Sequence, residues 1–372
     1  MPISYTRDVI IVGAGAAGIG IAVVLKQMGI NFVILEKEEV GASFKKWPEE
    51  TQFISPSFTG NFFKMPDLNA ITPESSPAFN LLTEHPTGSE YQEYLEAVSE
   101  HYAMNIDTGV TVENIQKKKG NFVISTNEGE YHSQFLIWAA GEYQYPNKDA
   151  FKGAELCTHY SEIKSFEDIK TKERIVIGAY ESGCDASINL TREGTKVTLL
   201  DRSNNFELIN SDSSYSLSPF TRDRLNEEDM SFDYQPDSGV EEVTFENGQY
   251  HVKTVSNKQY SSLHKPINCT GFTSSLCLIE DLFNYNEGYP TLNNYDESTK
   301  TKNLFLVGPQ VKHSNALFCF IYKYRQRFAI VSQQIASRQK IDKSVVKGVV
   351  KHYKDSNFYM KDLSCCDGEC VC

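Results

Sequence analysis

The residues of this chain best placed to do chemistry lie in two glycine-rich turns, 165 residues apart. In the first turn, Gly13, Gly15 and Gly18 form a G-x-G-x-x-G pattern between an apolar run and a stretch with helical spacing. The first glycine permits a tight turn, the second lets the backbone approach a pyrophosphate, and the third lets the helix pack on the strand. Glu36 follows 23 residues after Gly13, at the end of the next apolar run, where its carboxylate can accept hydrogen bonds from a ribose 2′-OH. This spacing predicts a dinucleotide-binding turn.

The second turn, from Gly178 to Gly183, repeats the order of strand, turn, helix, strand and acidic residue. Tyr180 stands where the pattern has its second glycine, and a side chain there restricts how closely the backbone approaches a phosphate. Asp201, after the next apolar run, suits a free 2′-OH and hence NADH, whereas the adjacent Arg202 suits a 2′-phosphate and hence NADPH. The sequence leaves this choice open, and it also allows a unit kept only for structure.

Four cysteines gather in the last eight residues, at Cys365, Cys366, Cys370 and Cys372. Their spacing includes no histidine and is not a zinc-ribbon pattern, but four thiolates can hold a soft ion such as Cu(I) or Zn(II). They are candidate soft-metal or redox thiols, with a mobile tail of reduced thiols as the alternative. The other five cysteines are scattered, and we expect them to be reduced, half-buried small hydrophobic residues.

Composition limits the partners and the compartment. The formal net charge of −13 argues against sequence-independent binding to nucleic acid or to an anionic membrane. Residues 9–25 carry no charge, but this run is shorter than a spanning helix and is broken by glycines, so a strand-turn-helix unit explains it better. We therefore expect a cytoplasmic protein without a membrane partner.

The chain length favours two domains, and the repeated strand-helix-strand units predict an α/β fold with parallel sheets. The second unit is expected to be inserted in the first, which gives residues 1–154 and 291–345 for one domain and 155–290 for the other. Residues 41–86 read as a long loop and residues 315–339 as a helix, and beyond residue 343 the periodicity fades into a C-terminal extension over 346–372.

With GAGAAG and Glu36, the segment WAAGEYQYP at 138–146, and the second turn, the chain resembles the two-dinucleotide-binding flavoproteins. The resemblance implies two Rossmann-like, three-layer ββα domains, with FAD in the first and NADPH or NADH in the inserted one. Arg222 and Arg224 are further candidates for contact with a 2′-phosphate, although a solvated helix face explains them equally well.

The resemblance assigns residues to both cofactors. For FAD they are Gly13, Gly15, Ala16, Gly18, Glu36, Lys37, Ser43, Phe44, Trp47, Val112, Ala140, Gly141 and Gly308. For the nicotinamide dinucleotide they are Gly178, Tyr180, Glu181, Ser182, Gly183, Asp201 and Arg202.

Within these flavoproteins, several loose matches resemble the flavin-containing monooxygenases and related small bacterial flavoproteins. They are GASFKKWP at 41–48, SFTGNFFKMPD at 57–67, FKGAELCTHYS at 151–161 and SGCD at 182–185. The resemblance implies hydride transfer to flavin N5, then reaction with O2 to a C4a-hydroperoxide that oxygenates a small soft nucleophile or carbonyl. It places Asn61 near the flavin as a hydrogen-bond donor. Aromatic residues at 44, 47, 53, 58, 62 and 63 either exclude water as a lid or belong to the core.

Two alternatives remain at this stage. One is an NAD(P)H-dependent thiol-disulfide or soft-metal reductase, because the tail resembles the C-terminal LSCC of mercuric reductases. The body lacks a closely spaced cysteine pair, and Gly308 is followed by Pro309 rather than the acid that disulfide reductases usually carry. The other is a redox- or metal-sensing flavoprotein with little turnover. The expected partners are a small-molecule substrate and O2 or a disulfide as electron acceptor, and a homodimer remains open.

Overall fold

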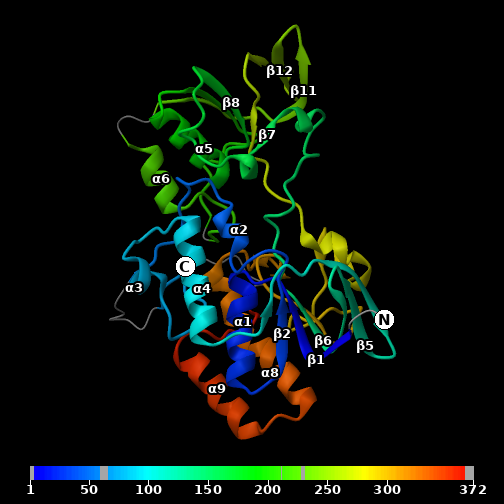
Figure 1. Cartoon of the computed structure of the whole chain (residues 1–372). Helices are drawn as coiled ribbons and strands as arrows, with labels where there is room; N and C mark the ends of the chain where they lie inside the picture. The colour runs from blue at the N-terminus through cyan, green and yellow to red at the C-terminus, as the bar shows by residue number, and fades with distance from the viewer. Residues whose placement is uncertain (1–3, 59–65, 211, 228–230, 365–372) are drawn as a thin grey trace.

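The computed structural model describes residues 4–58, 66–210, 212–227 and 231–364. Two lobes are joined by extended segments, and α2 lies where they meet (Figure 1). The first lobe carries both ends of the described chain, and the second is built from its middle. In the described part, no helix is long and apolar enough to cross a bilayer.

A seven-stranded sheet forms the centre of the first lobe, in the order β3-β2-β1-β6-β5-β4 with β17 beside β6. Its strands are β1 (Ser4–Val12), β2 (Phe32–Leu35), β3 (Ile106–Asp107), β4 (Val112–Lys118), β5 (Asn121–Thr126), β6 (Gly129–Trp138) and β17 (Leu304–Leu306). β1 runs parallel to β2 and β6, whereas β4, β5 and β6 form an antiparallel meander. All four residues of β2 are buried, which explains its unbroken apolar run.

The first lobe also contains helices. They are α1 (Ala16–Gln27), α2 (Ala42–Lys45), α3 (Pro77–Leu81), α4 (Gly88–His101), α7 (Ile321–Tyr324), α8 (Phe328–Gln339) and α9 (Lys343–Asp355), with the 3₁₀ turn η5 (Arg325–Arg327). Of these helices, α1 packs directly on β1 and β2. α4 begins at a capping box in which Thr87 and Glu90 bond each other's backbone N–H. α1 and α8 approach so closely that a Cβ on Gly20 would lie 2.2 Å from the Phe328 ring.

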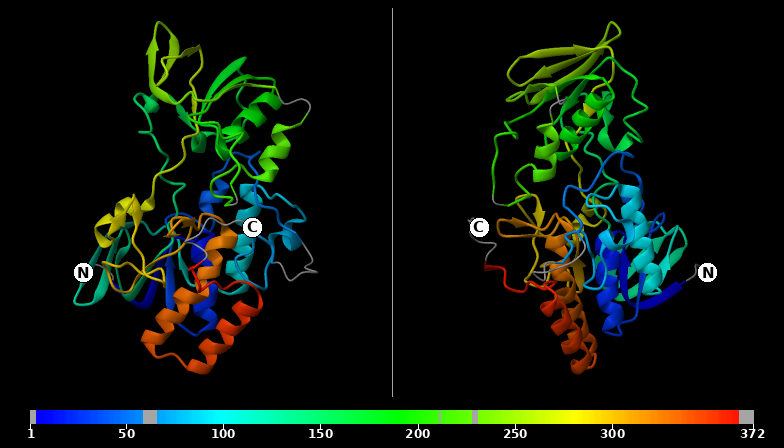
Figure 2. Two further views of the ribbon diagram at one scale, coloured as in Figure 1. Left: turned by 180° about the vertical axis from the view of Figure 1, so that it is seen from behind. Right: turned by 90° about the vertical axis from the view of Figure 1, so that its left-hand side faces the viewer.

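The second lobe holds an all-parallel sheet in the order β10-β9-β8-β14-β7. Its strands are β7 (Thr158–His159), β8 (Glu173–Ile177), β9 (Lys196–Leu200), β10 (Asp233–Gln235) and β14 (Ile267–Asn268). Its helices are α5 (Glu181–Arg192) and α6 (Pro219–Leu225), with the 3₁₀ turns η1 (Ala154–Leu156) and η2 (Tyr160–Glu162). An antiparallel sheet of β11 (Val240–Glu246), β12 (Gln249–Thr254) and β13 (Gln259–Ser262) caps the end of this lobe (Figure 2).

The return to the first lobe is made of short elements. They are η3 (Ser275–Leu278), η4 (Glu280–Leu282), β15 (Tyr285–Asn286), β16 (Tyr289–Pro290), β18 (Lys312–His313) and β19 (Ala316–Leu317). Leu276, Ile279 and Phe283 already pack in the core of the first sheet. We therefore propose to place the end of the inserted unit near residue 274 rather than 290.

The α/β fold with two Rossmann-like units is confirmed, but two predicted segments differ. The helix expected from residue 315 begins at Ile321, because residues 312–317 form the hairpin of β18 and β19. The fading periodicity beyond residue 343 hid α9, a helix capped by Asp342 whose buried residues are Val350 and Tyr353. Since both pack in the first core, we propose that the first unit includes α9.

Candidate active-site cavity

The first glycine turn has the geometry of a tight strand-to-helix connection. Gly13 has φ +103°, and a Cβ there would lie 2.6 Å from the Ala139 carbonyl oxygen. A Cβ on Gly18 would lie only 1.9 Å from the carbonyl oxygen of Gly13. Backbone cannot yield easily at such distances, so these two positions accept only glycine.

Gly15 differs from its neighbours, and this difference tests whether FAD fits. It is the N-cap of α1 with ordinary extended dihedrals (φ −83°, ψ −171°), so its backbone does not require glycine. A Cβ there would meet nothing within 4 Å, although the residue borders a cavity. The missing side chain thus leaves free space directly before a helix N-terminus, where a pyrophosphate gains N–H donors and a favourable dipole. These residues fit an FAD.

Glu36 lies beside this turn at the end of β2. Its carboxylate accepts hydrogen bonds from the backbone N–H of Ala14 (2.7 Å) and of Glu38 (2.9 Å). Burial raises the pKa of this carboxyl. The carboxylate borders the cavity, so the contact with a ribose hydroxyl stays a prediction that the position supports.

A cavity of about 610 Å³ lies between the lobes and takes its walls from both. Of the residues predicted to bind FAD, its lining includes Gly13, Gly15, Ala16, Glu36, Lys37, Ser43, Phe44, Trp47, Val112, Ala140 and Gly141. Gly18 packs under the turn, and Gly308, at φ +115°, stands next to Pro309, which does line the cavity. Glu181 and Ser182 line it from the second glycine turn.

Aromatic rings form one wall of the cavity. The Phe44 ring centroid lies 5.3 Å from that of Trp47 and 5.7 Å from that of Phe53, and the Phe53 ring packs tilted against Tyr91 of α4 with the centroids 4.4 Å apart. Phe44, Trp47 and Phe53 line the cavity and pack in or against the core of the first lobe, whereas their predicted role in excluding water stays a prediction. Asn61, with the aromatic residues at 62 and 63, lies outside the described residues, so its predicted hydrogen bond to the flavin stays a prediction.

The second glycine turn copies the first in backbone only. A Cβ on Gly183 would lie 1.7 Å from the Gly178 carbonyl oxygen, as tight as the matching pair in the first turn. Tyr180 has nearly the dihedrals of Gly15 (φ −99°, ψ −164°), so its side chain occupies the space that is open at the first turn. Its hydroxyl donates to the Ser216 carbonyl oxygen at 2.9 Å.

The acidic residues around the second turn are already bound by the protein. Both carboxylate oxygens of Glu181 accept hydrogen bonds, from the Ser218 N–H (2.6 Å) and the Thr221 hydroxyl (2.5 Å), and burial raises the pKa of this carboxyl. Asp201 is 1% exposed and accepts four hydrogen bonds, from Ser203, Tyr234 and both nitrogens of Asn205. Arg202 is exposed. As folded here, the second turn does not fit a nicotinamide dinucleotide in the pose that its fingerprint implies.

A buried network that the sequence did not reveal joins the lobes at the cavity. Asp185 of α5 pairs with Arg224 of α6 at 2.8 Å, and its other oxygen accepts from the Tyr160 hydroxyl (2.7 Å) and the Thr51 hydroxyl (2.8 Å). Arg224 is only 6% exposed, so the solvated helix face considered for it is wrong. Arg222 instead donates to backbone carbonyls, among them that of Phe206. The SGCD match pointed to Asp185, but nothing local pointed to Thr51.

Two further lining residues were missed, Glu142 and Cys319. Glu142 directly follows Gly141, and burial raises the pKa of its carboxyl, while the Gln310 side chain hydrogen-bonds to it. Cys319 approaches the Ser214 hydroxyl at 3.1 Å, and burial raises the pKa of its thiol. The position of Glu142 after the predicted Gly141 was the only signal in the sequence for either.

The remaining cysteines of the described chain do not gather into a site. Cys157, Cys184 and Cys269 are buried in the second lobe, and burial raises the pKa of each thiol, to about 12 for Cys157. Cys277 is exposed. Within residues 4–58, 66–210, 212–227 and 231–364, no group of three or more His, Cys, Asp or Glu side chains could hold a metal.

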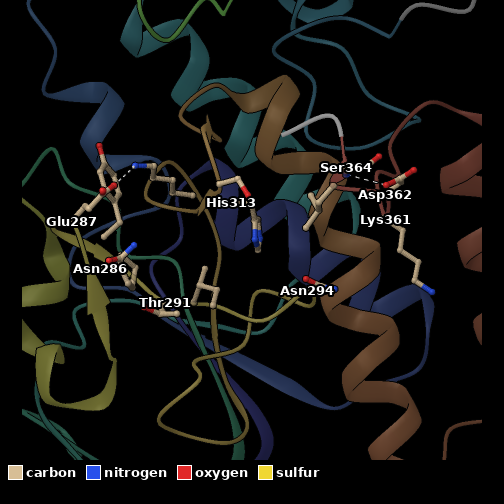
Figure 3. Close-up of a pocket in the computed structure, with 14 residues that line it drawn as sticks. Asn286, Glu287, Thr291, Asn294, His313, Lys361, Asp362 and Ser364 are labelled. Carbon is tan, nitrogen blue, oxygen red and sulfur yellow. Dashed lines mark hydrogen bonds and ion pairs between the residues drawn. The ribbon is translucent and has the colours of Figure 1, made fainter. Parts of the chain in front are cut away.

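A second, polar cavity of about 550 Å³ marks where the cysteine tail begins (Figure 3). Its lining includes Lys312 and His313 of the β18–β19 hairpin and the segment 361–364. Arg327 fixes that segment by donating to the Met360 carbonyl oxygen at 2.6 Å. The tail cysteines at 365, 366, 370 and 372 lie outside the described residues, and their metal or redox role stays a prediction.

A family model described as pyridine nucleotide-disulphide oxidoreductase matches residues 10–308. The chain belongs to this family. Bacilliredoxin reductase Bdr of Bacillus subtilis (strain 168) is 24% identical over 340 residues, which cover 89% of this chain and 98% of Bdr. The probable indole-3-pyruvate monooxygenase YUCCA1 of Arabidopsis thaliana is 28% identical over 203 residues, which cover 52% of this chain and 46% of YUCCA1.

The fold is shared with a solved flavin-containing monooxygenase from Stenotrophomonas maltophilia, at a TM-score of 0.68 and 14% identity, over 90% of this chain and 99% of that one. The predicted resemblance to two-domain flavoproteins is therefore confirmed. The chain is an FAD-dependent oxidoreductase of a family that uses FAD and NAD(P)H.

Proposed function

We propose that this flavoprotein is a monooxygenase that transfers one oxygen atom to a small soft nucleophile or carbonyl compound. The cavity between the lobes supports this proposal, because its described lining is largely aromatic and aliphatic and contains a single thiol, Cys319. FAD, when bound there, supplies the two-electron carrier that reacts with oxygen. Oxygen chemistry of this kind needs a site without bulk water, and the rings of Phe44, Trp47 and Phe53 exclude water from one wall.

Within this cavity, Glu142 is the carboxyl group free to hold and move a proton. Glu36 is bound by two backbone N–H groups, Glu181 by Ser218 and Thr221, and Asp185 by Arg224. Among the described residues, Glu142 forms a hydrogen bond with the Gln310 side chain and no ion pair with a lysine or arginine. The negative charge of Glu142 also contributes to raising the pKa of the Cys319 thiol. A carboxyl whose pKa is raised stays partly protonated nearer neutral pH, so it can donate to a departing or developing oxygen.

Glu142→Gln is expected to lower turnover of the oxygenated substrate by about a hundredfold, the usual contribution of a positioned acid. Wild-type turnover should fall as pH rises through the raised pKa of Glu142, and the glutamine variant should lack this limb. A readout independent of turnover is stability. Because the folded chain holds the Glu142 proton more tightly than the unfolded chain, wild-type stability falls as pH rises through that pKa.

The stability comparison separates a proton-holding residue from a merely structural one. Thermal unfolding of the flavin-loaded protein should leave Glu142→Gln increasingly more stable than wild type as pH rises. A constant difference across pH, together with parallel activity profiles, would contradict the assignment. Glu155→Gln, which removes an exposed carboxylate outside the cavity, is the matched control and should follow wild type.

A second candidate function is reduction of a disulfide of low-molecular-weight or protein origin. Cys319 favours it, because this thiol lines the cavity beside Ser214. The relative named bacilliredoxin reductase, which aligns along nearly its whole length, adds support. The cysteines of the tail are a further source of thiols, so this second candidate function includes reduction of a soft metal ion. A redox or metal sensor with little turnover remains the third possibility.

One experiment separates these functions. The flavin of the purified protein is reduced anaerobically by light or dithionite and then mixed with oxygen or with oxidised thiols. A monooxygenase is expected to reoxidise rapidly with oxygen, to oxygenate an added thioether or ketone, and to be indifferent to disulfides. Fast reoxidation by disulfides that Cys319→Ser abolishes would instead establish the reductase. Slow reoxidation of the flavin by every acceptor would exclude both enzymes and favour the redox or metal sensor.

A further inference from the structure

The segment Ser216–Thr221 lies across the N-terminus of α5, where a dinucleotide-binding unit would receive its pyrophosphate. Four hydrogen bonds hold it there. The Tyr180 hydroxyl donates to the Ser216 carbonyl oxygen (2.9 Å), and Glu181 accepts from the Ser218 N–H (2.6 Å), the Ser218 hydroxyl (3.4 Å) and the Thr221 hydroxyl (2.5 Å). The segment leads into α6, whose N-cap is Ser218.

The first turn provides an internal comparison, since both turns have the same backbone. At the first, Gly15 leaves free space before α1. At the second, the Tyr180 side chain fills the equivalent space, and the first residue of α5 is an acid rather than Ala16. A carboxylate at that position competes with a phosphate for the helix N–H groups and repels its charge.

The adenosine end of the second site is also closed. The carboxylate of Asp201 would have to release a donor such as Tyr234 before it could bind a ribose hydroxyl. Breaking a charge-assisted hydrogen bond in a buried site is costly unless the ligand replaces it. In two separate parts of the second site, the polar groups that would bind the dinucleotide thus already form hydrogen bonds within the protein.

We propose that Ser216–Thr221 is a plug in the second nucleotide site, and that a nicotinamide dinucleotide binds on α5 only after the plug has released Tyr180 and Glu181. In this arrangement Glu181 takes the place of the phosphate by accepting the hydrogen bonds of Ser218 and Thr221. Tyr180 and Glu181 are therefore residues that set the affinity for the dinucleotide.

The plug is also tied to the first lobe. The residues just before the plug contact α7, which follows the β18–β19 hairpin. The Ser213 hydroxyl lies 2.5 Å from that of Tyr322, and Asp212 forms an ion pair with Lys323. Release of the plug is consequently coupled to the contact between the lobes. Binding of the dinucleotide would loosen one wall of the cavity at the moment when electrons are delivered.

The test measures binding of NADP⁺ and NAD⁺ to the oxidised, flavin-loaded full chain by calorimetry, so that no turnover is involved. Glu181→Ala removes two acceptors of the plug, Thr221→Val removes one hydroxyl at nearly constant volume, and Tyr180→Gly restores the open space. The apparent affinity is proportional to the fraction of molecules whose site is open, and each variant increases that fraction. Each variant should therefore bind at least one dinucleotide about tenfold or more tightly than wild type. Tyr359→Phe is the matched control, since it removes a tyrosine hydrogen bond to Gln333 within the first lobe that touches neither the plug nor α5, and it should bind as wild type does.

Hydrogen exchange supplies a second readout that does not depend on any variant. Saturating dinucleotide should speed exchange in residues 216–221 of the wild-type chain, because the Ser218 amide loses its acceptor. Slower exchange there, or variants that bind both dinucleotides no better than wild type, would overturn the plug. If Glu181→Ala proves unfolded by circular dichroism, Thr221→Val and the exchange measurement decide. The reaction of photoreduced flavin with oxygen requires no dinucleotide, so failure of the plug and failure of the proposed monooxygenase are told apart.

Discussion

Gly15→Ala is expected to give a folded chain that has lost most of its flavin. The Gly15 backbone is extended and its absent Cβ faces free space, so alanine causes no strain in the protein itself. The new methyl group would instead stand where the pyrophosphate of FAD approaches the N-terminus of α1. We expect FAD binding to weaken by about tenfold to a hundredfold, or about 1.4–2.8 kcal/mol. The flavin-to-protein ratio after purification, and titration of the flavin-free chain with FAD, measure the loss.

Two other glycine variants bracket this result. Gly18→Ala places a Cβ 1.9 Å from the Gly13 carbonyl oxygen, so it should damage the turn and lower stability along with flavin content. Gly348→Ala, in the interior of α9, meets nothing within 4 Å and should stabilise the chain by about 0.5–1 kcal/mol without changing flavin content. If Gly15→Ala keeps FAD at wild-type affinity, FAD does not bind at this turn.

Asp185→Asn is expected to destabilise the chain by about 3–5 kcal/mol, the usual cost of leaving one partner of a buried ion pair without its counter-charge. Asp185 and Arg224 are 7% and 6% exposed, and the same carboxylate also accepts from Tyr160 and Thr51. The amide of asparagine cannot satisfy all of these donors. Urea unfolding of the flavin-loaded protein measures the change in the free energy of unfolding.

The control for this variant is Glu227→Gln, which removes the exposed partner of Arg192. Surface pairs of this kind contribute about 0–1 kcal/mol, so its stability should stay near that of wild type. Because Thr51 comes from the first lobe, loss of Asp185 should also loosen the lobes against each other and speed proteolysis between them. Equal stabilities of the two variants would mean that the buried network does not hold the lobes.

The sequence could predict what depends on local spacing. The glycines at 13, 15 and 18 and the acid at 36 belong to a single strand-helix-strand unit, so their arrangement follows from the order of the residues. The degenerate second turn was visible for the same reason, through Tyr180. The partners of Asp185 could not be predicted in this way, because Thr51 lies 134 residues away and meets it only when the lobes pack. Helix α9 was missed because its buried residues are only Val350 and Tyr353, and four lysines interrupt the rest of the helix.

The return of the chain to the first lobe also governs when that lobe can be completed. α1 packs on α8, which begins about 300 residues after α1 ends, and β6 pairs with β17, which begins about 165 residues after β6 ends. At ribosomal rates α1 therefore waits about 15–60 s for its helix, and β6 about 8–33 s for its strand. The second lobe is continuous in sequence and can form while the first still waits. The newborn chain therefore exposes the apolar face of α1 and the open edge of β6 until each partner has been made, which makes the first lobe the part most dependent on chaperones during synthesis.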